Sequence, residues 1–150
     1  MPERPFRSRG GVRVRRTGRR TIEEPIDELW RRYAASRGSL ELRNRLAERY
    51  APMVRRLADE AAGEIRRFLD ARLRERIAAD ELESAGIPAL LDAVSNFDPA
   101  GGERFEDYAA PLIRDAIDDE VRSLDWLPLS FFARGIRRQN GPAEREEPRT

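Results

Sequence analysis

The chain has 150 residues, 39% of them hydrophobic and 38% charged, with a net charge of +1, which predicts one domain of amphipathic helices with tails. It contains no Cys and no His, and this excludes disulfides, thiolate metal sites, a cysteine nucleophile and the commonest general base. No apolar run approaches the roughly 18 residues that span a bilayer. The N-terminus also lacks the apolar segment of a secretory signal, so we expect a cytoplasmic protein.

Arginine is concentrated at the N-terminus. All 29 basic residues are arginines, and residues 1–20 contain eight of them against one acid, Glu3, a local net charge of +7. Because the whole chain carries +1, the remaining residues carry −6. We predict a disordered Arg-rich arm over residues 1–21. This arm is either a solvated tail without a partner or a segment that contacts phosphate groups or RNA.

The first two predicted helices follow the arm. Pro25 suits a first helical turn, and an apolar stripe with helical spacing continues as far as a break at residues 36–38: Ile26, Leu29, Trp30 and Tyr33. Ser39 is the predicted N-cap of a long second helix. Pro52 should kink this helix or shift its start, and the pattern leaves its end undefined up to Ile77. The apolar stripe of this second helix comprises Leu42, Leu46, Tyr50, Met53, Val54, Leu57, Ala61, Ile65, Phe68 and Leu69.

Two further helices are separated by a turn at residues 98–102, where Pro and two Gly cannot continue a helix. The third helix runs from about Asp80 to Phe97, and its apolar face consists of Leu82, Ala85, Ala89, Leu90, Ala93, Val94 and Phe97. The fourth runs from about Phe105 to Leu124, and Pro111 should bend or delay it. Its apolar stripe consists of Phe105, Tyr108, Ala109, Leu112, Ile113, Ala116, Ile117, Val121 and Leu124.

The C-terminal residues predict one short helix and a tail. Ser130 is a candidate cap for a last helix that carries Phe131, Phe132, Arg134, Arg137 and Arg138. From Asn140 the chain is rich in Pro, Glu and Arg and should be disordered. The elements together predict an all-α fold, a compact bundle of about four helices with disordered N- and C-terminal tails. The helical domain is expected over residues 22–130, and the short basic helix and disordered tail over residues 131–150.

Three groups of residues are candidates for function, and each has a structural alternative. Ile87 and Leu91 widen the apolar arc of the third helix, which indicates either burial on two sides or a partner surface. Trp126 and the Phe131–Phe132 pair are either core residues or base-stacking residues beside nearby arginines. Carboxylates gather on the third and fourth helices, and a solvated acidic face is favoured over a metal site or an acid–base pair. No active site and no cofactor are therefore expected.

The order of motifs resembles region 2 of the sigma-70 family, and most closely its flagellar and sporulation branch. The resemblance covers about residues 26–130, and its upstream part consists of residues 29–33 and 49–54. The motifs that carry it are Asp80-Glu81-Leu82, Gly86 to Val94, Phe97-Asp98-Pro99, Phe105 to Ala109, Ile113 to Ile117, Asp119-Glu120-Val121-Arg122 and Asp125-Trp126-Leu127-Pro128-Leu129-Ser130.

The resemblance implies two surfaces. In that family the third helix docks on the clamp coiled coil of core RNA polymerase. Here this helix carries the candidate polymerase-binding residues Leu82, Glu83, Ile87, Leu91, Asp92 and Asn96. The fourth helix faces the −10 promoter element, which implies DNA-binding roles for Tyr108, Arg114, Arg122 and Trp126. An anti-sigma protein is a further partner that the resemblance allows.

Several departures from the family pattern bear on DNA binding. Asp107, Asp115 and Asp118 place acids where the family has neutral or apolar residues, and acids repel phosphate. Pro88 lies inside the docking helix, and Leu112 and Leu129 replace family arginines. One hypothesis is a sigma factor that recruits polymerase to −10 DNA. The alternative is a clamp-binding module that competes with other sigma factors without reading DNA. A third class, a small metal-dependent enzyme, is disfavoured.

Overall fold

The computed structural model describes residues 23–134, and these form helices with no strand among them. The predicted Arg-rich arm and the C-terminal tail, including Arg137 and Arg138, lie outside the described residues. The prediction of an all-α fold is confirmed. The elements are α1 (Ile26–Ala35), α2 (Leu40–Arg67), α3 (Ala71–Arg74), α4 (Ala79–Asn96), the 3-10 turn η1 (Pro99–Gly101), α5 (Phe105–Arg122) and α6 (Leu129–Arg134).

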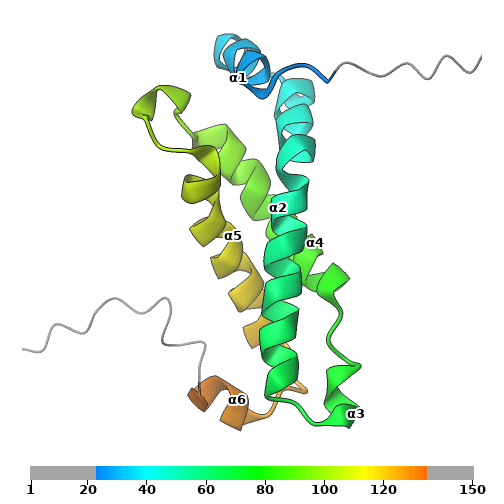
Figure 1. Cartoon of the computed structure of the whole chain (residues 1–150). Helices are drawn as coiled ribbons and strands as arrows, with labels where there is room; N and C mark the ends of the chain where they lie inside the picture. Colours follow the sequence, from blue (N-terminus) through cyan, green and yellow to red (C-terminus); the bar gives the residue numbers. More distant parts are fainter. Residues whose placement is uncertain (1–22, 135–150) are drawn as a thin grey trace, which may run out of the picture.

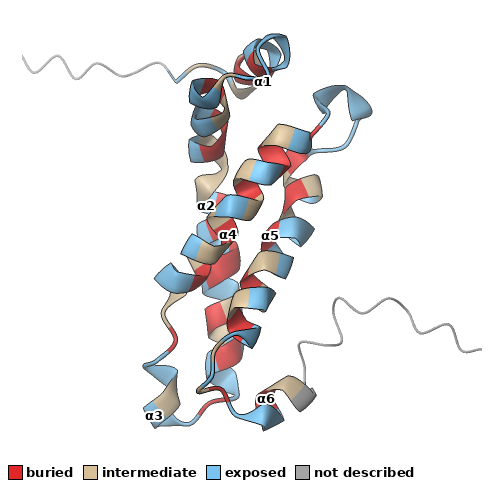
Figure 2. Ribbon diagram, turned by 180° about the vertical axis from the view of Figure 1, so that it is seen from behind, coloured by how far each residue is buried: buried red, intermediate tan, exposed pale blue. Residues whose placement is uncertain are grey.

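The three longest helices, α2, α4 and α5, run lengthwise beside one another and form the body of the molecule (Figure 1). Helix α1 lies across one end of this bundle, and α3 and α6 lie at the opposite end. Figure 2 shows that buried residues gather on the sides of the three long helices that face one another. The core therefore lies between these three helices, as apolar stripes of helical spacing predict, and it extends to buried residues of α1 and α6.

Side-chain caps define where α2 and α3 begin. The Oγ atom of Ser39 accepts a hydrogen bond of 3.2 Å from the backbone N–H of Leu42, which confirms Ser39 as the N-cap of α2. Helix α2 ends at Arg67, and the carboxylate of Asp70 then caps the short α3 by accepting from the N–H groups of Arg72 and Leu73. The Asp70 cap marks the boundary between α2 and α3, which the apolar periodicity of the sequence left undefined.

Each of the three long helices continues through an interior proline. Neither α2 nor α5 has its start shifted by its proline. A proline removes the hydrogen bond to the carbonyl four residues earlier, and here each proline and the residue four positions before it are exposed, so water can satisfy the released carbonyl. The pairs are Pro52 with Glu48, Pro88 with Ser84, and Pro111 with Asp107.

The buried line of α5 is narrower than the predicted stripe. It follows a spacing of four residues through Phe105, Ala109, Ile113, Ile117 and Val121. Leu112 is one residue away from this line, about 100° around the helix, and it is 41% exposed. Placing Leu112 in the core was therefore wrong.

Two further expectations also require correction. Phe68, at the C-cap of α2, is 56% exposed, whereas Leu69, the next residue of the predicted stripe, is 4% exposed. Helix α6 begins at Leu129, so Ser130 lies inside the helix and is not its cap. Phe131 is buried, in agreement with its interpretation as a core residue.

A cluster of aromatic rings joins α1 to the bundle. The Trp30 ring centroid lies 5.3 Å from those of both Phe97 and Phe105, and 6.2 Å from that of Tyr50. The indole Nε1–H of Trp30 donates a 2.9 Å hydrogen bond to the Tyr50 hydroxyl. A single side chain of α1 thus contacts α2, the end of α4 and the start of α5.

Burial raises the pKa of Tyr50 above its ordinary value near 10. The unfolded chain therefore ionises Tyr50 first, and the stability that this group contributes is complete below about pH 10 and is lost as pH rises through the folded pKa. We expect the urea midpoint to fall above about pH 10. The matched variant Tyr50→Phe should show a shallower fall, and an equal fall in both proteins would contradict the assignment.

Candidate functional site

The predicted polymerase-binding residues of α4 divide between the core and the surface. Leu82 is only 2% exposed and belongs to the core, so its side chain supports the helix from inside. Asp92 and Asn96 are exposed, while Glu83, Ile87 and Leu91 are half-buried. These three half-buried residues are spaced by four and therefore form one line along the helix. The surface that remains for a partner is this line with Asp92 and Asn96 beside it.

The spacing of Ile87 and Leu91 left open whether they are buried or form a partner surface, and the structure is compatible with both. Both pack partly against the core cluster, and both keep part of their surface exposed. Around them α4 carries four acids, Asp80, Glu81, Glu83 and Asp92, and no basic residue. The exposed side of α4 is thus apolar along its centre and negative around it.

An ion cluster that the sequence did not reveal fixes the start of α4 on α2. The guanidinium of Arg55 donates to Glu83 at 2.9 Å, contacts Asp59 at 3.2 Å and also donates to Asp80. The hydrogen bond to Glu83, followed by the one to Asp80, raises the pKa of Arg55. Because Arg55, Asp59 and Asp80 are 47%, 54% and 82% exposed, the cluster orients the Glu83 carboxylate more than it stabilises the fold.

The predicted DNA-binding residues lie along the whole length of α5 and do not converge. Tyr108 and Arg122 are separated by about 21 Å of helix at 1.5 Å per residue. The ring of Tyr108 is half-buried and packs against Phe97 at 5.3 Å. Arg114 is exposed, and Arg122 is exposed and paired with Asp119 at 2.8 Å. This is an extended surface and not a pocket.

The same helix is strongly acidic. Helix α5 carries two arginines, Arg114 and Arg122, against six acids. Those acids are Glu106, Asp107, Asp115, Asp118, Asp119 and Glu120. A net charge of −4 on one helix opposes the approach of a phosphate backbone.

Trp126 follows α5 and is half-buried. The guanidinium of Arg76, from the segment between α3 and α4, lies 4.9 Å from the centroid of its ring. Trp126 therefore both packs against the core and takes part in a cation–π contact at the surface. The sequence did not indicate this contact, because the two residues are 50 positions apart.

Neither a metal centre nor a membrane span is found among residues 23–134. No three potential metal-ligating side chains gather at one place in this part of the chain. None of its helices is both long enough and apolar enough to cross a membrane.

Residues 46–127 match the family model described as sigma-70 region 2. The matched span begins within α2, contains α4 and α5, and ends just before α6. The chain belongs to the sigma-70 region 2 family. The resemblance stated from the motifs is thereby confirmed, and it covers more than half of the chain.

Similar full-length relatives are sigma factors. The chain is 40% identical over 85 residues to the RNA polymerase sigma factor FliA of Pseudomonas aeruginosa, covering 57% of this chain and 31% of the relative. It is 38% identical over 103 residues to FliA of Salmonella typhimurium, covering 67% and 40%. It is 43% identical over 56 residues to the RNA polymerase sigma-D factor of Bacillus subtilis, covering 37% and 22%. The chain thus spans less than half the length of these relatives, and no solved structure matches it significantly.

Proposed function

We propose that this protein docks on the clamp coiled coil of core RNA polymerase through the exposed side of α4 and takes part in promoter −10 recognition and transcription initiation. The observation that carries the proposal is the sigma-70 region 2 match, which spans both α4 and α5. In this role the protein acts as a binding factor and not as an enzyme, and it works in the cytoplasm.

The chemistry of α4 supports a partner surface that is basic around an apolar centre. Ile87 and Leu91 offer partly exposed apolar area, which is what the buried centre of an interface requires. The surrounding acids favour a partner rich in Arg or Lys, because complementary charge accelerates and orients association. Glu83 is held in place by Arg55 before any partner arrives.

The double variant Ile87→Ser/Leu91→Ser tests this docking surface. Each change removes apolar area that the complex would bury, at about 25 cal/mol per Å², so we expect affinity for core polymerase to fall about ten-fold or more. Affinity is measured by fluorescence anisotropy of the labelled full chain titrated with purified core polymerase. Circular dichroism checks that the helices persist.

The matched control is Leu40→Ser/Leu129→Ser, which makes the same chemical change at two leucines that are 63% and 87% exposed and lie outside α4. This control should bind polymerase as the unchanged chain does. An equal loss in both double variants, or no binding of the unchanged chain at micromolar concentration, would reject the docking proposal.

The acidity of α5 supports a second candidate function, a module that occupies the clamp and competes with other sigma factors without reading DNA. In vitro transcription separates the two candidates. Transcripts that depend on a −10 element would reject the competitor. Inhibition of another sigma factor, without transcripts of its own, would reject the initiator.

A further inference from the structure

The C-terminal end of α4 is not closed by its own residues. The last four carbonyl groups of a helix have no partner within that helix. Helix α4 has no basic residue in its last turn, and Phe97, Asp98 and Pro99 follow it in place of the glycine that often closes a helix. Two acids at this end, Asp92 and Asp98, add to the negative end of the helix dipole. A cationic donor from another element is therefore favoured here.

Arg37, in the turn between α1 and α2, supplies this donor. Its guanidinium donates to the Ser95 carbonyl at 3.1 Å and to the Phe97 carbonyl at 3.2 Å. The same guanidinium lies 5.6 Å from the centroid of the ring of Tyr33, which is buried. The two carbonyls flank Asn96, so one side chain holds the backbone on both sides of that residue.

The last turns of α4 carry three of the candidate docking residues, Leu91, Asp92 and Asn96. The side-chain amide of Asn96 donates to the Asp92 carbonyl at 2.9 Å, and the Ser95 hydroxyl donates to the Leu91 carbonyl at 3.0 Å. These bonds connect residues 95 and 96 to the turn before them. The hold of Arg37 on the end of the helix therefore extends to all three docking residues.

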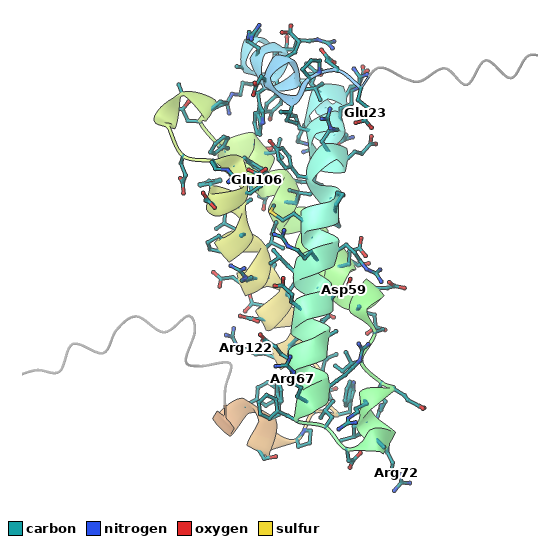
Figure 3. The ribbon with its side chains drawn as sticks, in the orientation of Figure 1. Glu23, Asp59, Arg67, Arg72, Glu106 and Arg122 are labelled. Carbon is teal, nitrogen blue, oxygen red and sulfur yellow. The ribbon has the colours of Figure 1, made fainter. Side chains whose placement is uncertain are left out.

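Helix α4 is thus held at both ends by arginines from earlier in the chain. Arg55 forms the ion cluster at its start, where Figure 3 shows Asp59 on the side of α2 next to α4. Arg37 bonds its end. The ring of Trp30 in α1 also packs against Phe97 at 5.3 Å. The end of α4 is therefore positioned by α1 and the turn that follows it.

We propose that Arg37 is a positioning residue for docking, which fixes the last turn of α4 so that Leu91, Asp92 and Asn96 meet the partner in one arrangement. The inference rests on the proposed docking of α4 on core polymerase. It adds the α1–α2 turn to the residues on which docking depends, although the family match begins only at residue 46. A turn that is ordered before binding loses less conformational freedom on binding, so Arg37 raises affinity without contacting the partner.

The experiment compares variants of the full chain for their affinity to purified core polymerase by fluorescence anisotropy. The test variant is Arg37→Ala, and Arg37→Lys keeps the positive charge but replaces the forked guanidinium by a single ammonium group. The matched control is Arg31→Ala, which removes the same kind of side chain from α1 at a position that is 75% exposed. Circular dichroism establishes that each variant is folded under the conditions of the titration.

We expect Arg37→Ala to bind polymerase about five-fold more weakly or worse, because the loosened side chains must be ordered on binding. Arg37→Lys should recover part of the affinity, and Arg31→Ala should bind as the unchanged chain does. Backbone amide hydrogen exchange should become faster at residues 94–97 of Arg37→Ala and stay unchanged at residues 80–90, because only the end of the helix is released. A general loss of stability would instead accelerate exchange along the whole helix.

A double-mutant cycle tests whether Arg37 acts through the last turn of α4. Combined with Asn96→Ala, Arg37→Ala should weaken binding by a smaller factor than it does alone, because one of the residues that it positions is already lost. Combined with Ile87→Ser, which lies more than two turns earlier, Arg37→Ala should weaken binding by its full factor.

Equal affinities of Arg37→Ala and Arg31→Ala would overturn the inference, as would an undiminished effect of Arg37→Ala beside Asn96→Ala. Equal acceleration of exchange along the whole of α4 would also overturn it. If Arg37→Ala does not fold, Arg37→Lys decides, and binding equal to that of the unchanged chain with unchanged exchange at residues 94–97 rejects the inference. In each of these cases the docking proposal stands, whereas an unchanged chain that does not bind polymerase rejects both proposals.

Discussion

Replacing Trp30 by alanine should lower the free energy of unfolding by about 3–5 kcal/mol, the range typical of a large aromatic side chain deleted from a core. Trp30 is 7% exposed and contacts rings from α2, from the end of α4 and from the start of α5. Its loss leaves a cavity among these rings and also removes the donor to the Tyr50 hydroxyl. Urea unfolding followed by circular dichroism measures the change.

Two control variants separate the loss of the buried ring from the loss of the indole hydrogen bond and from the loss of an exposed apolar side chain. Trp30→Phe keeps a ring but removes the indole donor, so it should cost less than Trp30→Ala. Leu40→Ala removes an apolar side chain that is 63% exposed, and should change stability by less than about 0.5 kcal/mol. A Trp30→Ala protein as stable as Leu40→Ala would show that α1 is not held by this cluster.

Two glycine-to-alanine changes should have opposite signs. A Cβ atom at Gly86 of α4 would lie 2.8 Å from Val54 Cγ1 and 3.2 Å from Ile113 Cγ2, whereas a Cβ atom at Gly63 of α2 meets nothing within 4 Å. Alanine is favoured over glycine inside a helix by about 1 kcal/mol, so Gly63→Ala should stabilise by up to that amount. Overpacking costs about 1–3 kcal/mol, so Gly86→Ala should destabilise despite the same gain.

The clash at Gly86 can be tested by making room for the new methyl group. Val54→Ala removes the atom that Gly86→Ala would strike, so the double variant should be more stable than the sum of the two single effects predicts. Stability is again measured by urea unfolding. Strict additivity, or a stabilising Gly86→Ala, would contradict the close approach of α2 and α4 at this glycine.

The longer helices α1, α2, α4 and α5 were predictable because each leaves a periodic signal in its own residues, whereas the four-residue α3 is too short to leave one. The cap at Ser39 and the apolar face of α4 are local features. The cap is found as expected, and of the predicted face Leu82, Leu90, Ala93, Val94 and Phe97 are buried whereas Ala85 and Ala89 are half-buried. Gly86 was missed as a core residue because its burial comes from the approach of Val54 and Ile113, which belong to other helices. Leu112 was placed in the core because an apolar residue beside a buried line looks the same in the sequence whether or not a third helix covers it.

The candidate surfaces likewise contain features that are local in the sequence and features that depend on contacts between distant residues. The candidate residues on the exposed line of α4 were named from the order of motifs along the chain, and their role in binding stays a prediction. Contacts of Arg55 with Asp80 and Glu83 span 25 and 28 residues, and nothing in the local pattern pairs them. The Arg76–Trp126 contact likewise depends on how the α3–α4 segment packs beside the residues that follow α5. Such pairs arise from tertiary packing, which one unaligned sequence does not record.

If α4 docks as proposed, the partner and Arg55 would compete for one carboxylate, that of Glu83. Arg55 already occupies it, so a basic group of a partner must share it or displace Arg55. Thermodynamic linkage makes this exchange reciprocal. The Arg55–Glu83 contact weakens binding of the partner by a certain free energy, and the bound partner weakens the Arg55–Glu83 contact by the same free energy. Since the Arg55 and Glu83 side chains remain 47% and 29% exposed, solvent screens their contact, and the coupling tunes affinity by degrees and does not act as a switch.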